Sequence, residues 1–234
     1  MDRTPPLIKH LIIINIIMFL ATQMMPQQMI SLFAMHFPLN PQFRVWQLLT
    51  HMFMHANLMH LAFNMYALWA FGIPLYHIWG EKKFLIFYFA AGLGAVLLYT
   101  GVQYYTFMHE LQTLVAQGIP KEEVFKVLNI GKVYTDFKEM GEIYYSIMLG
   151  ASGAIYGLLV AFAFYFPNAE LMLMFIPYPI KAKYFVPLLV LLDLTFGITN
   201  VIHTPIAHMA HVGGALVGFI LMKTWQKYNH KRWY

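Results

Sequence analysis

The chain has 234 residues, of which 60% are hydrophobic and 11% charged, and its formal net charge is +5. Soluble domains carry about 25% charged residues and the mean hydropathy here is +0.58, so the composition predicts a membrane protein. The absence of cysteine excludes disulfides, thiolate metal sites and a cysteine nucleophile. No run of Lys and Arg with interleaved aromatic residues indicates a nucleic-acid partner, and the positive charge is typical of basic cytoplasmic loops.

Six segments are long and apolar enough to cross a bilayer, which takes about 20 residues of helix. They cover about residues 7–25, 58–79, 84–105, 145–166, 184–202 and 206–225. No A-x-A-like cleavage site follows the first segment, so we expect it to be retained and not removed as a signal peptide. The predicted fold is an all-α polytopic membrane protein, a single domain over residues 1–234 with six transmembrane helices.

The distribution of Lys and Arg predicts the orientation of these spans, because cytoplasmic loops carry an excess of both. One side holds ten of the 15 Lys and Arg residues: Arg3, Lys9, Lys82, Lys83, Lys181, Lys183, Lys223, Lys227, Lys231 and Arg232. On the other side, acidic residues outnumber basic ones in the long segment 106–144. We therefore expect both termini to be cytoplasmic. The pattern of spans without a large extra domain fits the bacterial cytoplasmic membrane.

Two segments on the predicted outer side are long. Residues 26–57 are apolar for a loop, with "MISLFAMHFPL" and "WQLLTHMFMH", which predicts that they lie in the membrane interface. Residues 106–144 contain "KEEVFKVLNIGK", whose apolar spacing after Pro120 predicts a helix within a small solvated cap.

Few polar side chains occur inside the predicted spans, and such residues tend to mark function. At about 1.5 Å per residue, Ser152 lies about 10 Å and His211 about 8 Å below the outer end of its span. His60 and Asn64 share one helix face at depths of about 3 and 9 Å. Three spans therefore place a serine, two histidines and an asparagine in one layer beneath the outer surface.

Small residues accompany this layer on two spans. Gly153 and Gly157 are four residues apart on the fourth span, and Gly214 and Gly218 are four apart on the sixth. Small residues at this spacing let membrane helices approach closely. If the two faces meet, Ser152 and the histidine of the sixth span come within hydrogen-bonding reach, which is what activation of a serine nucleophile requires.

The segments "GASGAIYG", "AHMAHVGGALVG" and "HMFMHANLMHLAFNM" resemble motifs of the rhomboid family of intramembrane serine proteases. The resemblance covers about residues 5–225. It implies a six-helix bundle whose first outer loop lies sideways in the membrane and whose fifth span flanks a lateral substrate gate. The activity it implies is endopeptidase cleavage of single-span transmembrane proteins within the lipid bilayer, without a metal or another cofactor.

The resemblance also implies a role for each matching residue. Ser152 would be the nucleophile and His211 the general base, so that the two form a catalytic dyad. His60 and Asn64 would bind the oxyanion together with the backbone N–H of Ser152.

Further positions would support this dyad. By the same resemblance, Gly150 would shape the turn before the serine, Gly153 would complete the serine motif, and Tyr156 would pack against the histidine ring. Two positions depart from the family pattern: Gln47 stands where the family usually has arginine, and Tyr76 where it often has glutamate.

Other interpretations use overlapping residues. Asp193 is a candidate third catalytic residue, but its depth of about 13 Å is below that of His211, which favours a satisfied buried carboxyl. Five histidines suggest a metal site, although the H-E-x-x-H pattern of zinc peptidases is missing: His51, His55, His60, His208 and His211. The alternative function is a rhomboid-like pseudoprotease that binds or escorts membrane clients, although such relatives lose the serine or the histidine.

Overall fold

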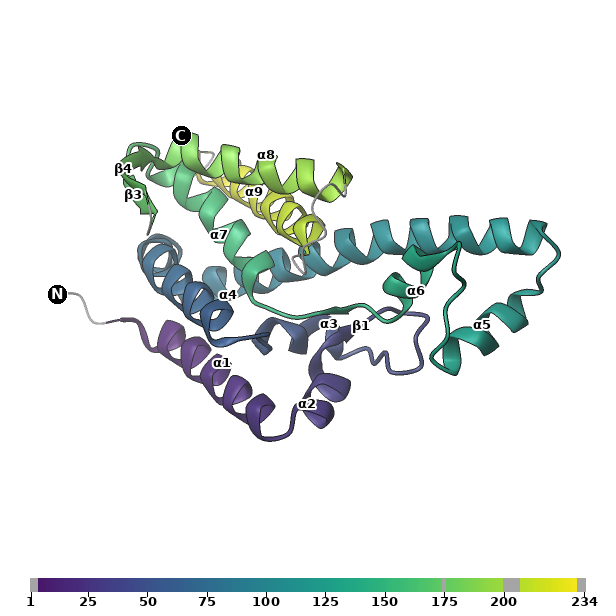
Figure 1. Ribbon diagram of the computed structural model, residues 1–234. Coiled ribbons are helices and arrows are strands. Elements are labelled where there is room, and N and C mark those ends of the chain that lie inside the picture. The colour runs from purple at the N-terminus through teal and green to yellow at the C-terminus, as the bar shows by residue number, and fades with distance from the viewer. Residues whose placement is uncertain (1–3, 174–175, 200–206, 231–234) are drawn as a thin grey trace.

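The computed structural model describes residues 4–173, 176–199 and 207–230 (Figure 1). The helices are α1 (Pro6–Met24), α2 (Pro26–Phe33), α3 (Gln47–Thr50), α4 (Leu58–Ala116), α5 (Lys121–Asn129), α6 (Lys138–Tyr144), α7 (Ser152–Tyr165), α8 (Ala182–Thr199) and α9 (His208–His230), with a 3-10 turn over His51–Phe53. Strand β1 (Met35–His36) pairs with β2 (Ile147–Met148), and β3 (Glu170–Leu173) pairs with β4 (Ile176–Lys181), both antiparallel. The predicted end of the fifth span and start of the sixth lie in residues 200–206, outside the described residues.

Three helices of the described chain are long and apolar enough to cross a membrane: α1, α4 and α8. Helix α4 bends at Gly80, whose φ of 75° is left-handed, so it divides into a first arm (58–79) and a second arm (81–116). Helix α7 is apolar but has only 14 residues, and α9 has 23. The structure is therefore a helical membrane bundle, as the sequence predicts, while the count of six spans remains a prediction.

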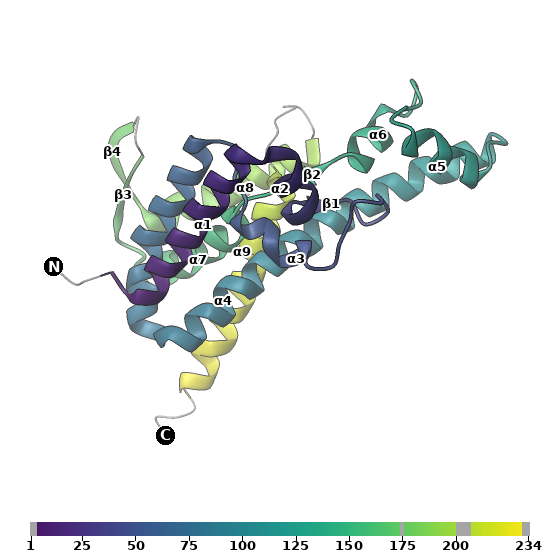
Figure 2. The ribbon, with the colours of Figure 1, turned by 90° about the horizontal axis from the view of Figure 1, so that it is seen from below.

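The second arm of α4 extends beyond the predicted end of the third span at residue 105 and continues to Ala116. The extension is helical because its buried apolar side chains recur every three to four residues and pack against α5 and α6. This second hydrophobic cluster contains Phe107, Leu111, Leu114, Val124, Leu128, Met140 and Tyr144. The extension, α5 and α6 form a cap, which projects to one side of the other helices in both ribbon views (Figures 1 and 2).

The fourth span also differs from the prediction of a helix that begins near residue 145. Residues 147 and 148 form strand β2, Gly150 has a φ of 126°, and α7 begins only at Ser152. An L-residue rarely adopts such a φ, so Gly150 separates the extended segment from the helix. A rise of 1.5 Å per residue does not apply to an extended segment, and the depth predicted for Ser152 rested on that rise.

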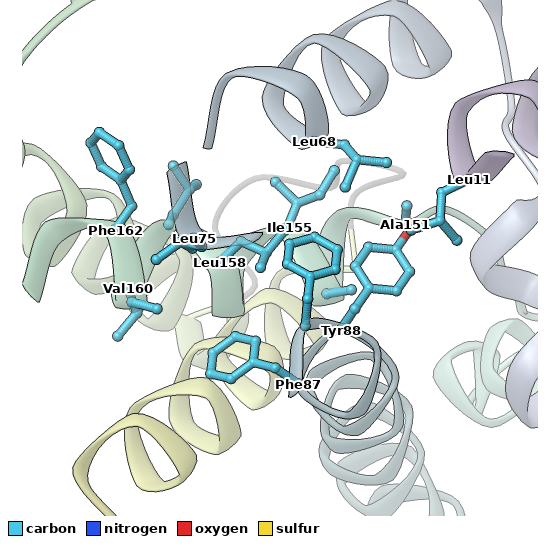
Figure 3. Packing of buried hydrophobic residues seen from close by; sticks show 14 of the residues in the cluster. Leu11, Leu68, Leu75, Phe87, Tyr88, Ala151, Ile155, Leu158, Val160 and Phe162 are labelled. Carbon is cyan, nitrogen blue, oxygen red and sulfur yellow. The ribbon is translucent and has the colours of Figure 1, made fainter. Parts of the chain in front are cut away.

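The main hydrophobic core surrounds α7, which packs against α4, α9 and α8 and carries buried residues on most of its surface. In Figure 3, Ile155 and Leu158 of α7 point toward Leu68 and Leu75 of the first arm of α4. An apolar helix without a polar face is suited to the interior of a bundle. The core therefore fixes the position of α7, whose first residue is Ser152.

Glycines bring α7 and α9 into backbone contact, as the sequence predicts. A Cβ added at Gly214 would lie 1.9 Å from the Gly153 carbonyl oxygen, and one added at Gly218 would lie 2.6 Å from the Gly157 Cα. Neither position leaves room for a larger residue, which confirms that the paired small residues serve close approach.

The loop between α1 and α4 is organised by Gln47, whose side chain is fully buried. Its amide nitrogen donates to the carbonyl oxygens of Ser31 (2.9 Å) and Gln42 (3.1 Å). Its amide oxygen accepts the backbone N–H groups of Arg44 (3.0 Å) and His36 (3.3 Å). A neutral amide thus satisfies four backbone groups at the position where the family usually has arginine.

Candidate active site

Ser152 is the first residue of α7 and lies at a helix end that has no side-chain cap, because the N-cap position is Ala151. The first N–H groups of a helix have no partner within the helix, and the helix dipole favours negative charge there. The turn before the serine is tied down, since the Gly150 N–H donates to the His51 carbonyl oxygen at 2.9 Å. The serine hydroxyl and free backbone donors are therefore presented together.

His211 lies in the first turn of α9 and faces Ser152 across the contact between α7 and α9. Its Nε2 lies 2.9 Å from the Ser152 Oγ. The ring stacks on Tyr156, with centroids 4.2 Å apart and planes inclined by 10°. The side chain is 12% exposed, so the imidazole is held by its neighbours while its edge stays accessible.

The other nitrogen of His211 contacts Asp193 on α8, at 3.1 Å from Nδ1 to Oδ1. The sequence favours a carboxyl that lies below His211, whereas the structure places the two side chains in contact. Counting residues along separate helices gives a depth for each but not their lateral distance, which is why this contact was missed. The signal that could have found it is the rarity of an ionisable residue inside a span, which marks a functional site by default.

His60 and Asn64 both lie on the first arm of α4, but their side chains have different surroundings. The His60 ring faces Gly150, where an added Cβ would lie 2.8 Å from its Cε1 and Nε2 atoms. The Asn64 amide nitrogen donates to the His60 carbonyl oxygen at 2.7 Å, within its own helix. The structure thus brings His60 to the serine motif, whereas one amide proton of Asn64 is already engaged.

A cavity of about 740 Å³ opens beside these groups. Ser152, His211, His60 and Gly150 are among its described lining residues, and Asn64 is not. Such a volume is within the range of sites that take ligands, and part of its wall is the uncapped first turn of α7. The cavity is where a peptide carbonyl can meet both the hydroxyl and the backbone donors.

Two histidines of the loop between α1 and α4, His51 and His55, are buried. Burial lowers the pKa of His51 to about 4, against the raising effect of hydrogen bonds to backbone carbonyls. Burial, followed by the influence of His60, lowers the pKa of His55 to about 3. The His51 Nδ1 lies 2.9 Å from the Gln47 carbonyl oxygen, which supports a structural role for His51 in the loop.

The histidine set suggested as a metal site is not assembled in the described part of the chain. The group there whose ligand atoms lie within 4.8 Å of one another is instead Asp193, His208 and His211. These atoms already hydrogen-bond to one another, so their proximity has an explanation without an ion.

The fold and the site define a polytopic helical membrane protein with a serine and a histidine in contact at a cavity. The Rhomboid domain family matches residues 42–227, and the chain belongs to this family. It is similar to the rhomboid protease AarA of Providencia stuartii, with 28% identity over 197 residues that cover 80% of this chain and 58% of AarA.

Two other relatives extend the comparison. Rhomboid protease GluP of Bacillus subtilis (strain 168) is 44% identical over 48 residues, which cover 20% of this chain and 10% of GluP. The mitochondrial presenilin-associated rhomboid-like protein of Homo sapiens is 28% identical over 186 residues, 78% of this chain and 39% of that protein. The chain spans less than two thirds of the length of each of these three relatives.

Proposed function

We propose that this protein is an intramembrane serine endopeptidase in which Ser152 is the nucleophile and His211 the general base. The observation that carries the proposal is the distance of 2.9 Å between the Ser152 Oγ and the His211 Nε2, at the wall of a cavity. A nucleophile and a base within 2.6–3.2 Å are the signature of this chemistry. Membership of a family that includes proteases supports the same assignment.

The reaction proceeds through an acyl-enzyme. The His211 Nε2 takes the Ser152 proton while Oγ attacks the substrate carbonyl carbon, and the tetrahedral intermediate collapses as the imidazolium gives its proton to the leaving amine. Water then attacks the ester, with His211 again as base, and releases the carboxylate product and the free serine.

Stabilisation of the oxyanion is assigned to donors near Ser152. Its own backbone N–H, at the uncapped start of α7, and the His60 ring, which faces Gly150, support this assignment. Asn64 contributes through its second amide proton. Gly150 and Gly153 keep the turn and the helix contact in place, and neither tolerates a Cβ without movement of its neighbours.

The substrates we propose are single-span transmembrane proteins, cleaved near the outer leaflet of the lipid bilayer. A peptide bond in a helix is hydrogen-bonded and covered, so a cleavable segment has small residues at the cut and helix-breaking residues just below it. The distribution of basic residues supports cytoplasmic termini, and we assign the protein to a bacterial cytoplasmic membrane.

Labelling by a fluorophosphonate probe tests this function in the detergent-solubilised protein. We expect the wild type to label, and Ser152→Ala and His211→Ala to lose labelling while keeping the wild-type melting temperature. A folded wild type that does not label, or variants that label as the wild type does, would refute the assignment. Binding and escort of membrane clients without cleavage would then be the better account.

A further inference from the structure

The carboxylate of Asp193 is the junction of three helices. Asp193 lies on α8 and is 5% exposed. Side chains from α7 and α9 contact its carboxylate. The Nδ1 atoms of His208 and His211 on α9 lie 2.5 and 3.1 Å from Oδ1, and the hydroxyl of Tyr156 on α7 hydrogen-bonds to Oδ2.

These contacts fix the proton positions on His211. With Asp193 ionised, its carboxylate only accepts hydrogen bonds, so the groups in contact with it are the donors. The His211 Nδ1 must then carry a proton, which leaves Nε2 as the acceptor in a neutral ring. Nε2 is the atom that lies 2.9 Å from the Ser152 Oγ, so this tautomer is the one in which the ring can take the serine proton.

The orientation of the ring is fixed by the same residues. Tyr156 stacks on the face of His211 and its hydroxyl hydrogen-bonds to Asp193. This one side chain therefore contacts both His211 and Asp193. A link between α8 and α9 requires only the bond from His208 to Asp193. The bond from His211 to Asp193 is not needed for that link. Its role is instead explained by orientation of the His211 ring.

We propose that Asp193 is a positioning residue of the active site, whose carboxylate holds His211 in the tautomer and orientation that serve Ser152. The inference rests on the proposed function, because it concerns the same serine and histidine. It adds a third member to the pair that the family resemblance implies. Asp193 does not touch the substrate; it acts through His211, and it stabilises the imidazolium that forms when the serine proton is transferred.

The test compares the rate constant for fluorophosphonate labelling, over a range of pH, in the wild type, Asp193→Asn and Asp193→Glu. Asparagine keeps the shape of the side chain but removes the charge. We expect Asp193→Asn to label about 10³–10⁴-fold more slowly, as is typical of serine-protease triads that lose this carboxylate. We also expect the acid limb of its profile to move to lower pH, because no carboxylate stabilises the imidazolium.

The other groups near the His211 ring are unchanged in these variants: His208 on α9, Tyr156 on α7 and His60 on α4. Asp193→Glu retains the charge, so its acid limb should stay near that of the wild type even though the rate falls. Thr195→Val is the matched control on α8, because Thr195 is exposed and bonds only to its own helix at the Leu191 carbonyl oxygen. It should label at the wild-type rate.

Each outcome decides between orientation and mere packing. If Asp193→Asn labels at the wild-type rate with an unchanged pH profile, the inference is wrong while the proposed function stands. If Asp193→Asn has a lower melting temperature but its folded fraction shows no shift of the acid limb, the inference is also wrong. The contact between Asp193 and His211 would then serve stability alone. Loss of wild-type labelling after treatment with EDTA would replace it with a metal site. A wild type that never labels would remove the proposed function, and the inference with it.

If Asp193→Asn does not fold, His208→Gln provides the second test. It removes the other imidazole from Oδ1 but leaves the bond to His211. We expect labelling within about tenfold of the wild type, with the acid limb still set by the carboxylate. A folded His208→Gln that labels about 10³-fold more slowly than the wild type would contradict the inference, because the bond from Asp193 to His211 would then not be enough to position the base.

Discussion

Gly214→Ala tests whether catalysis depends on the close contact between α7 and α9. The added Cβ would lie 1.9 Å from the Gly153 carbonyl oxygen, whereas ordinary contact begins at 3.4 Å, so the two helices must separate locally by about 1.5 Å. A hydrogen bond of 2.9 Å between Ser152 and His211 would then lengthen beyond the limit of about 3.2 Å. A displacement of about 1 Å can lower a rate about 10²-fold, and overpacking costs about 1–3 kcal/mol.

The assay measures cleavage of a transmembrane substrate in detergent together with the melting temperature. We expect Gly214→Ala to lower kcat by about 10²-fold or more and to lower the melting temperature. Gly101→Ala is the matched control, because no atom lies within 4 Å of the added Cβ at that helical position. It should leave activity unchanged and stabilise α4 by up to about 1 kcal/mol. Wild-type activity and melting temperature in Gly214→Ala would refute the claim that this contact sets the geometry of the site.

Two further predictions concern the oxyanion site and pH. Asn64→Ala should lower kcat by about 10²–10³-fold without unfolding the protein, as loss of one oxyanion donor does, and an unchanged rate would assign the amide to its bond within α4 alone. Burial lowers the pKa of His51 from 6.5 to about 4, so below pH 6.5 the unfolded chain binds a proton that the folded chain does not. Stability should therefore fall between pH 6.5 and about pH 4 by about 1.4 kcal/mol per unit for this residue, and His51→Asn should flatten the fall in melting temperature. If the melting temperature of His51→Asn depends on pH as that of the wild type does, the lowered pKa of His51 is contradicted.

The sequence could predict those parts of the site that depend on helical periodicity and residue size. The glycine pairs of α7 and α9 identified the two faces that meet, and added Cβ atoms at Gly214 and Gly218 confirm it. Ser152 and His211 lie next to that contact because they are close in sequence to these glycines. The composition alone also required a membrane bundle, because so few charged residues cannot cover a water-facing surface.

The boundaries were harder to predict, because hydrophobicity does not distinguish an extended apolar segment from a helix. Residues 145–151 are as apolar as a span, yet pairing of β2 with β1 and the backbone conformation of Gly150 delay the helix to Ser152. The extension of α4 to Ala116 likewise depends on packing against α5 and α6, a tertiary contact that the hydrophobicity of one segment does not reveal.

The sequence by itself determined that the protein lies in a membrane, that it is helical, and which two helix faces carry paired small residues. These features follow from composition and local spacing. The tertiary structure decided which polar groups meet. It joined Asp193 to His211 across two helices and directed the Asn64 amide to its own backbone. A one-dimensional depth does not specify the tilt, rotation or lateral distance of a helix, and hydrogen bonds at 3 Å depend on all three.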